Sequence, residues 1–198
     1  MVINILGASL QSQGKVEGAL EVYDRAIKSN PKFAEAHNNK GNALKELGRG
    51  AEALTSYEHA VELAPKFFAA FKNLGVALTE QDRFEDAIKA FDQAIELKSD
   101  FLEAYVGRAH AKKQLQQFNE ALIDHQHIIQ HKPRWIDAYL NYGDSLKNLG
   151  RLDEAVAIYE KAIAINPTDG RAYNNWGKCL ASKNDFEGAL IKYETATK

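Results

Sequence analysis

Small and large apolar residues recur along the chain with a period of 34 residues. One phase holds alanine in every repeat, at Ala19, Ala53, Ala87, Ala121, Ala155 and Ala189. A second phase of small residues comprises Gly7, Gly41, Gly75, Ala109, Gly143 and Gly177. Because small residues let two helix axes approach closely, we expect paired helices to cross at these two phases. Large aromatic residues such as Tyr23, Tyr57 and Phe91 recur at another phase and should fill the space between layers.

Residues that end helices follow the same period. All four prolines share one phase, and proline ends one repeat and lets the next helix begin because it has no backbone N–H. A second breaker phase contains mostly residues that tolerate left-handed backbone, namely Gly14, Gly48, Asp82, Gln116, Gly150 and Asn184. Each repeat is therefore predicted to fold as helix, tight turn, helix, tight turn, which makes the chain all-α.

This pattern resembles that of the tetratricopeptide repeat family. The fifth repeat shows the family's positions most completely, with Tyr139, Tyr142, Gly143, Leu146, Ala155, Tyr159, Ala162 and Pro167. The resemblance covers essentially the whole chain as one array, with repeats at about 1–33, 34–67, 68–101, 102–135, 136–169 and an incomplete 170–198. It implies an alpha-alpha superhelix, a right-handed solenoid, whose first helices line a concave groove and whose second helices form the convex back.

Charge and composition narrow the possible partners. The chain has 25 Lys and Arg against 27 Asp and Glu, so no broad positive field is available for nucleic acid or for anionic membrane surfaces. Cys179 is the only cysteine, which rules out an intramolecular disulfide and a cysteine-based zinc site. The sequence shows neither a signal peptide nor a membrane-spanning run, so we expect a cytoplasmic location.

The predicted groove is rich in amides. Asn39, Asn73, Asn141 and Asn175 recur at one phase, which Gly107 interrupts. An asparagine side chain can both donate to and accept from a peptide backbone, so such a row could hold an extended segment; alternatively, the amides bond to a neighbouring helix or to water. The candidate peptide-binding residues are Asn38, Asn39, Asn42, Lys72, Asn73, His110, Asn141, Asp144, Asn174, Asn175 and Lys178.

Two narrower resemblances bear on the ligand. The array is similar to the asparagine-lined arms of the O-linked N-acetylglucosamine transferase family and of related bacterial proteins, but no residues remain for a glycosyltransferase domain. Chaperone-adaptor domains of the family grip a terminal carboxylate with three cations and two amides. Here Asn42 and Asn73 match the amides, whereas the cation positions hold Asn38, Glu103 and Gly107. A carboxylate clamp of that type is therefore not expected.

The fourth repeat departs from the pattern. Lys112 replaces the usual leucine, His125 the aromatic residue and Ile128 the alanine, so we expect its packing to be the least regular. His127 and His131 have the spacing of a helical metal pair, but no further ligand completes a site, so neither metal nor cofactor is expected. A partly buried His125 could instead tune pH sensitivity.

No nucleophile elbow, phosphate loop or metal signature is present, so the sequence predicts no enzyme. The function expected from these observations is a protein–protein interaction scaffold that binds extended segments of partner proteins in its groove. The alternative is a structural, oligomerising or spacer segment of a larger enzyme, such as a repeat-containing glycosyltransferase. Because repeat arrays normally carry polar capping repeats, self-association through uncapped ends is also possible.

Overall fold

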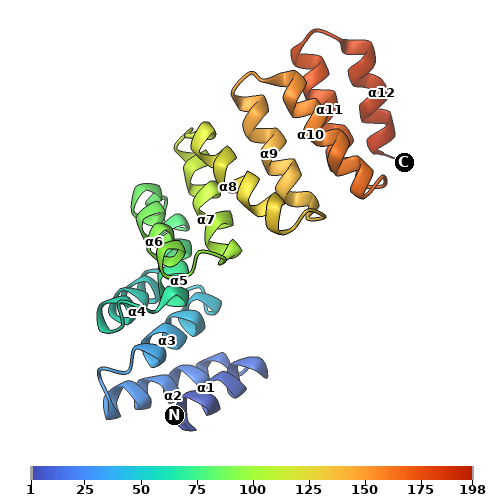
Figure 1. Cartoon of the computed structure of the whole chain (residues 1–198). Helices are drawn as coiled ribbons and strands as arrows, with labels where there is room; N and C mark the ends of the chain where they lie inside the picture. The colour runs from blue at the N-terminus through green and yellow to red at the C-terminus, as the bar shows by residue number, and fades with distance from the viewer. Residues whose placement is uncertain (1, 198) are drawn as a thin grey trace. The chain divides into compact units, whose positions relative to one another are not determined.

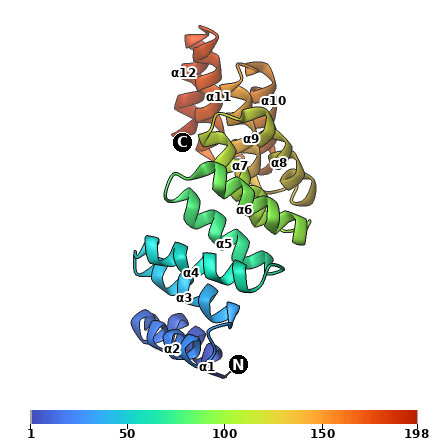
Figure 2. The same cartoon turned by 90° about the vertical axis from the view of Figure 1, so that its left-hand side faces the viewer.

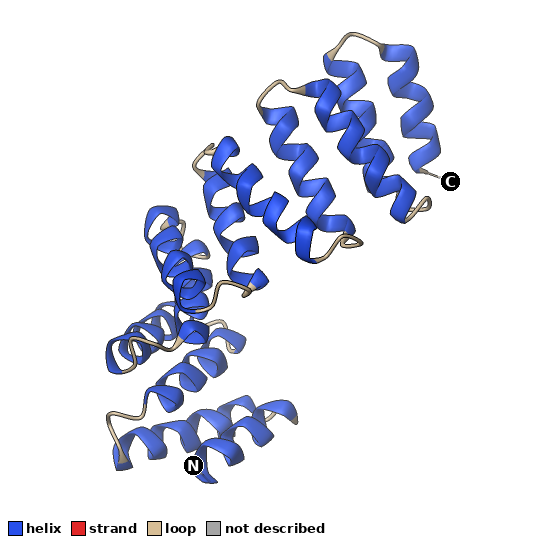
Figure 3. Cartoon of the chain, viewed as in Figure 1, coloured by secondary structure: helices blue, strands red, loops and turns tan. Residues whose placement is uncertain are grey.

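The computed structural model describes residues 2–197, and side-chain environments within residues 4–197; the ends of the predicted array, Met1 and Lys198, lie outside the described residues. All regular structure in this range is helical (Figure 3). The helices are α1 (Val2–Ser12), α2 (Val16–Ser29), α3 (Ala34–Glu46), α4 (Gly50–Leu63), α5 (Phe68–Thr79), α6 (Phe84–Leu97), α7 (Leu102–Gln114), α8 (Phe118–His131), α9 (Ile136–Asn148), α10 (Leu152–Ile165), α11 (Gly170–Ser182) and α12 (Phe186–Ala196).

The small-residue phases lie where the helices of a pair cross. A Cβ atom added to Gly41 would lie 2.6 Å from the Tyr57 ring, and one added to Gly143 would lie 2.5 Å from the Tyr159 ring. Both rings are almost fully buried, as are the alanines of the Ala19 phase. The structure thus confirms the predicted crossing points, because only glycine leaves room for an aromatic ring directly against the facing helix.

The turn inside each helix pair uses left-handed backbone. The residues of this phase all have positive φ: 74° at Gly14, 73° at Gly48, 56° at Asp82, 58° at Gln116, 74° at Gly150 and 63° at Asn184. Left-handed backbone is favourable for glycine and costs other residues energy, so the three non-glycine turns are strained relative to the glycine turns. The predicted turn phase is confirmed.

The chain divides within α7 into two compact units, one through Ala111 and the other from Lys112. The N-terminal unit contains α1–α6 and most of α7, and its helix pairs follow one another in chain order (Figures 1 and 2). The C-terminal unit contains the end of α7 and α8–α12, with α11 packed against both α9 and α12. Each unit has its own apolar core, one around Phe91 and one around Tyr159.

The fourth repeat is irregular, as predicted. The Lys112 ammonium lies 2.8 Å from the carboxylate of Asp124, and the two side chains are only 13% and 0% exposed. At the same phases the second repeat packs Leu44 against a helix that carries Ser56. His125 is 4% exposed, and its Nε2 has no hydrogen-bond partner within the described residues. A buried ion pair thus stands where the third and fifth repeats have apolar pairs, Leu78 with Ala90 and Leu146 with Ile158.

Candidate functional site

In the N-terminal unit, the amides predicted to line the groove bond to one another. Asn39 donates to Asn4 Oδ1 at 3.0 Å, and Asn38 donates to Asn39 Oδ1 at 3.2 Å. Asn73 donates to Asn38 Oδ1 at 2.8 Å and to Asn42 Oδ1 at 3.2 Å. A chain of amide contacts therefore runs from α1 across α3 to α5. From the sequence, these asparagines could either bind a ligand or bond to a neighbouring helix, and the structure shows bonds to neighbouring helices.

Little bonding capacity remains at the centre of this network. Asn73 uses both N–H groups, and its carbonyl accepts a hydrogen bond from Lys72 at 2.6 Å. The Asn42 carbonyl also accepts from the Tyr57 hydroxyl at 2.9 Å. Burial lowers the pKa of Lys72, as does the nearby Lys45. Asn73 and Asn42 thus hold α3 and α5 together, and ligand contact at these residues would have to break existing bonds.

The rest of this face is acidic and contains one gap in the amide row. Its glutamates include Glu35 and Glu103, both exposed, and Glu80, which pairs with Lys45 at 2.8 Å. Gly107 interrupts the asparagine phase because a Cβ atom there would lie 2.3 Å from Phe91 Cζ.

The last candidate of the N-terminal unit is His110. Its side chain is exposed on α7.

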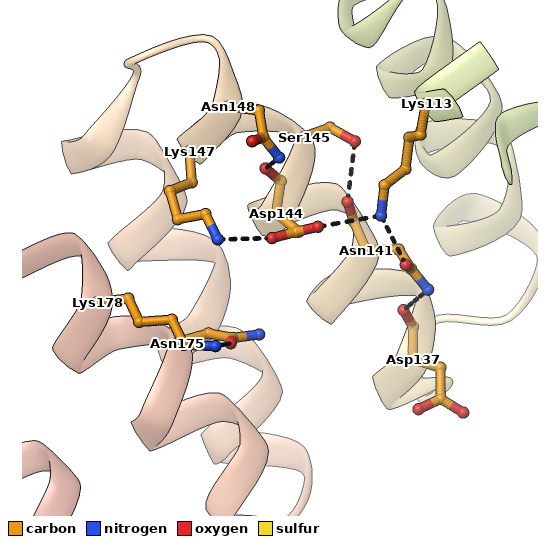
Figure 4. Close-up of polar contacts among 9 residues, drawn as sticks. All are labelled: Lys113, Asp137, Asn141, Asp144, Ser145, Lys147, Asn148, Asn175 and Lys178. Carbon is orange, nitrogen blue, oxygen red and sulfur yellow. Dashed lines mark hydrogen bonds and ion pairs between the residues drawn. The ribbon is translucent and has the colours of Figure 1, made fainter. Parts of the chain in front are cut away.

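In the C-terminal unit, the face is built around Asp144 on α9. Lys113 from the last turn of α7 approaches one carboxylate oxygen at 3.1 Å, and Lys147 approaches the other at 2.8 Å (Figure 4). Burial alone would raise the pKa of Asp144, but these two ammonium groups outweigh it and hold the pKa below its ordinary value. The three side chains are 18–32% exposed, so they remain open to solvent.

Asn141 lies beside this ion cluster. Its carbonyl accepts from Lys113 at 3.1 Å, and its amide donates to the backbone carbonyl of Asp137 at 2.9 Å (Figure 4). Asp137 itself pairs with Arg171 at 2.7 Å, and Arg171 also binds Asp169. The cation of Arg171 is therefore shared by two carboxylates.

Two asparagines on α11 keep most of their hydrogen-bonding capacity. Asn174 is half-buried and has no side-chain hydrogen bond within residues 4–197. Asn175 only accepts a long contact of 3.4 Å from Lys178, so its own amide N–H groups have no acceptor in the described part of the chain (Figure 4). The structure thus brings Asn141, Asp144, Asn175 and Lys178 onto two neighbouring helices and leaves the amide donors of Asn174 and Asn175 unused.

Beneath this face lies a buried hydroxyl. Tyr159 is fully buried, and its hydroxyl has no hydrogen-bond partner among the described residues. Burial raises its pKa, and the negative charge of Asp144 acts in the same direction. At the same phase in the second repeat, the Tyr57 hydroxyl donates to Asn42, and the residue equivalent to Asn42 is Asp144. Asp144 therefore pairs with Lys113 and Lys147, whereas Asn42 accepts a hydrogen bond from the Tyr57 hydroxyl.

The sequence reasoning did not include Asn4, Lys113 or Lys147 among the site residues. Their partners lie 35 residues away for Asn4 with Asn39, and 31 residues away for Lys113 with Asp144. The repeat is 34 residues long, so the first separation is one residue longer than the repeat and the second is three residues shorter. Residues at such separations are neighbours on adjacent first helices. Polar residues at such offsets were the signal that could have identified them.

The described residues lack the features of a metal site and of a membrane-spanning helix. Within residues 2–197, no three His, Cys, Asp or Glu side chains converge as metal ligands would. The centroids of the His127 and His131 rings lie 4.2 Å apart with the ring planes tilted by 36°, and His131 Nδ1 lies 2.9 Å from the backbone carbonyl of His127. No helix in this range is both long and apolar enough to cross a bilayer.

Paired helices in phase with a 34-residue period, with a polar face on each first helix, define a helical-repeat solenoid. Family models agree: one described as "TPR repeat" matches residues 7–48, and two described as "Tetratricopeptide repeat" match residues 39–100 and 136–169. The chain belongs to the tetratricopeptide repeat family. No curated protein matches it.

Several solved structures share this fold. YrrB, described as a TPR protein with an unusual peptide-binding site, is 24% identical, with 89% of this chain and 91% of YrrB covered and a TM-score of 0.77. MamA is 25% identical, with 86% and 93% covered and a TM-score of 0.79. A tetratricopeptide repeat protein from Parabacteroides merdae ATCC 43184 is 23% identical, with 98% and 76% covered and a TM-score of 0.69.

Proposed function

We propose that the chain is a protein-interaction scaffold that binds extended peptide segments of partner proteins along its first helices. The observation that carries the proposal is the unused hydrogen-bonding capacity of Asn174 and Asn175 on the groove face of α11. An extended segment presents a carbonyl and an N–H at each residue, and amide side chains can pair with both whatever the segment's side chains are. The similarity to YrrB, which has a peptide-binding site, supports the same function.

The two units contribute differently to this function. In the N-terminal unit, Asn38, Asn39, Asn42 and Asn73 are occupied by one another, so we assign them to positioning the first helices. In the C-terminal unit, Asn174, Asn175 and Lys178 can bond to a ligand without losing a strong internal contact. Direct peptide contact is therefore centred on α9 and α11.

The test is a selection of random displayed peptides against the whole chain, followed by calorimetric titration of the selected peptides. The double substitution Asn174→Ala with Asn175→Ala should weaken binding about tenfold, because two hydrogen bonds are lost. The matched control is Asn119→Ala, which removes an exposed amide from the second helix α8. Equal affinities for the wild type and the double variant would refute the proposed site.

We propose no catalytic activity for the chain. Apart from the buried Asp124 and His125, its histidines and carboxylates lie on repeated helix surfaces. Its single cysteine, Cys179, is fully buried, and that burial raises its pKa. A buried thiol with a raised pKa is a poor nucleophile. Proteins or peptides are the proposed partners, and the near balance of charge gives no reason to propose nucleic acid or membrane.

A second candidate function is self-association through α12. Phe186, Leu190 and Ile191 are 68%, 57% and 55% exposed, and they lie along one side of this helix. Leu190 occupies the phase of Leu54 and Leu122, which are buried in their own repeats. A mass measured by light scattering that rises with concentration, and no longer does so after Leu190→Glu, would support self-association. A constant monomer mass would reject it.

A further inference from the structure

The first-helix face of the C-terminal unit carries an excess of positive charge. Lys113, Lys147 and Lys178 place three ammonium groups on this face, against the single carboxylate of Asp144 (Figure 4). Arg171 pairs with both Asp137 and Asp169, so these three groups together add one negative charge, and four cations still stand against three carboxylates. Side chains from three helices thus supply more cations than the protein itself neutralises.

The corresponding face of the N-terminal unit has the opposite sign. Its carboxylates are Glu35, Glu46, Glu80 and Glu103, and its ammonium groups are Lys45 and Lys72. Lys45 is paired with Glu80, and Lys72 donates to Asn73. The positive face is therefore a local property of α9, α11 and the end of α7, since the whole chain is close to neutral.

Lys178 is the cation most available to a ligand. Within residues 4–197, no carboxylate lies within ion-pair distance of its ammonium group. Its one side-chain contact is the long hydrogen bond to Asn175, and both residues are on the groove face of α11. An incoming carboxylate could therefore pair with Lys178 and accept from the amide of Asn175 without displacing anything.

Asp144 plays the part of an internal carboxylate. It pairs with Lys113 and Lys147, although the Tyr159 hydroxyl is buried without an acceptor among residues 4–197. Burial raises the pKa of Tyr159, and the charge of Asp144 acts in the same direction. The equivalent residue Asn42 does accept from Tyr57. By analogy with Asn42, Asp144 could accept a hydrogen bond from the Tyr159 hydroxyl if another carboxylate took over the lysines.

We propose that the C-terminal unit binds an acidic extended segment, whose carboxylates pair with Lys178 and displace Asp144 from Lys113 and Lys147. The displaced Asp144 side chain then accepts a hydrogen bond from the Tyr159 hydroxyl. This proposal rests on the proposed peptide-binding function and specifies the chemistry of the peptide. It differs from the terminal-carboxylate clamp, since it uses lysines at other positions of the repeats and needs no chain terminus.

The probes are three short synthetic peptides with blocked ends, in which alanine alternates with glutamate, with glutamine or with lysine. Each is titrated into the whole chain while backbone amide NMR shifts are recorded. We expect the glutamate peptide alone to shift signals on α9 and α11, with an affinity that falls as salt rises. Binding of the lysine peptide to α9 and α11, or equal binding of the glutamine peptide, would overturn the proposal.

Variants then separate the roles of the residues. Lys147→Ala and Lys178→Ala should each weaken the glutamate peptide about fivefold, whereas Lys161→Ala, which removes an exposed lysine on α10, should not. Asp144→Asn should strengthen binding about fivefold, because it removes the competing charge. Tyr159→Phe should weaken binding without lowering stability, since the hydroxyl has no hydrogen-bond partner within residues 4–197. If Asp144→Asn weakens binding instead, Asp144 is a ligand contact and the displacement is refuted.

The peptide selection keeps this proposal distinct from the proposed function. Selected peptides enriched in glutamate and aspartate, with binding lost in Lys178→Ala, would support both. Selected peptides that bind α9 and α11 without acidic enrichment would overturn the acidic preference and leave the scaffold function standing. A library from which no peptide binds would overturn both.

Discussion

The ring of Phe91 fills the space that a side chain at position 107 would need. The ring is fully buried, and a Cβ atom on Gly107 would lie 2.3 Å from its Cζ atom. Gly107→Asn, which would complete the asparagine phase, should therefore destabilise the protein by about 1–3 kcal/mol in urea unfolding. Gly50→Ala is the control, because nothing lies within 4 Å of a Cβ atom there. Equal stability of the two variants would show that the ring can move aside.

The strained turn of the fourth repeat should improve with glycine. Gln116 has φ of 58°, whereas Gly150, at the same phase of the next repeat, has φ of 74°. Gln116→Gly should raise the free energy of unfolding by up to about 1 kcal/mol, and Gly150→Ala should lower it by about 1 kcal/mol. Urea unfolding followed by circular dichroism measures both. A loss of stability in Gln116→Gly would contradict the assigned strain.

Breaking the buried ion pair of Lys112 and Asp124 should lower the stability strongly, whereas replacing both residues by apolar ones should change it little. Removing one partner, as in Asp124→Ala, leaves an uncompensated buried charge and should cost about 3–5 kcal/mol. The double variant Lys112→Leu with Asp124→Ala copies the third repeat, which has Leu78 and Ala90, and should recover most of that loss. A double variant as unstable as the single one would show that the ion pair itself is required.

His125 should make the protein less stable in acid. Burial lowers its pKa from 6.5 to about 4; Lys113 and Lys112 add to this, and Asp124 and Asp144 oppose it. Between these pH values the unfolded chain binds a proton that the folded chain does not, so stability falls as pH decreases. The loss should approach about 3 kcal/mol near pH 4.

The double variant His125→Tyr with Ala109→Gly restores the aromatic ring and the glycine beneath it that the other repeats have, so its stability should depend less on pH over this range. Urea midpoints measured from pH 7 to pH 4 test this. Parallel curves for the two proteins would contradict the assignment of the pH dependence to His125.

The fold was predictable because its determinants repeat. Glycine under an aromatic ring, as in Gly41 and Tyr57, has one steric explanation, which holds in every repeat except the fourth, where Ala109 and His125 stand at these phases. The left-handed turn residues, such as Gly48, also have one steric explanation, and it holds in every repeat. The amide phase was harder to interpret, because an asparagine can bond equally well to a neighbouring helix or to a ligand. Asn73 bonds to α3, whereas Asn175 has unused donors, and their phase is the same.

The difference comes from residues outside that phase. Asn38 and Asn42 on the preceding helix offer acceptors to Asn73, whereas the corresponding residues before Asn175 are Leu140 and Asp144, and Asp144 is held by two lysines. Pairings of this kind depend on side-chain positions across two helices. The period alone does not specify them.

The central claim is that partner segments lie along the first helices of the C-terminal unit. The most direct test is to record backbone and asparagine side-chain amide NMR shifts while a peptide selected from the random library is added. We predict the largest changes at Asn174, Asn175 and Lys178, with smaller ones on α9. Changes confined to the second helices α10 and α12 would contradict the claim.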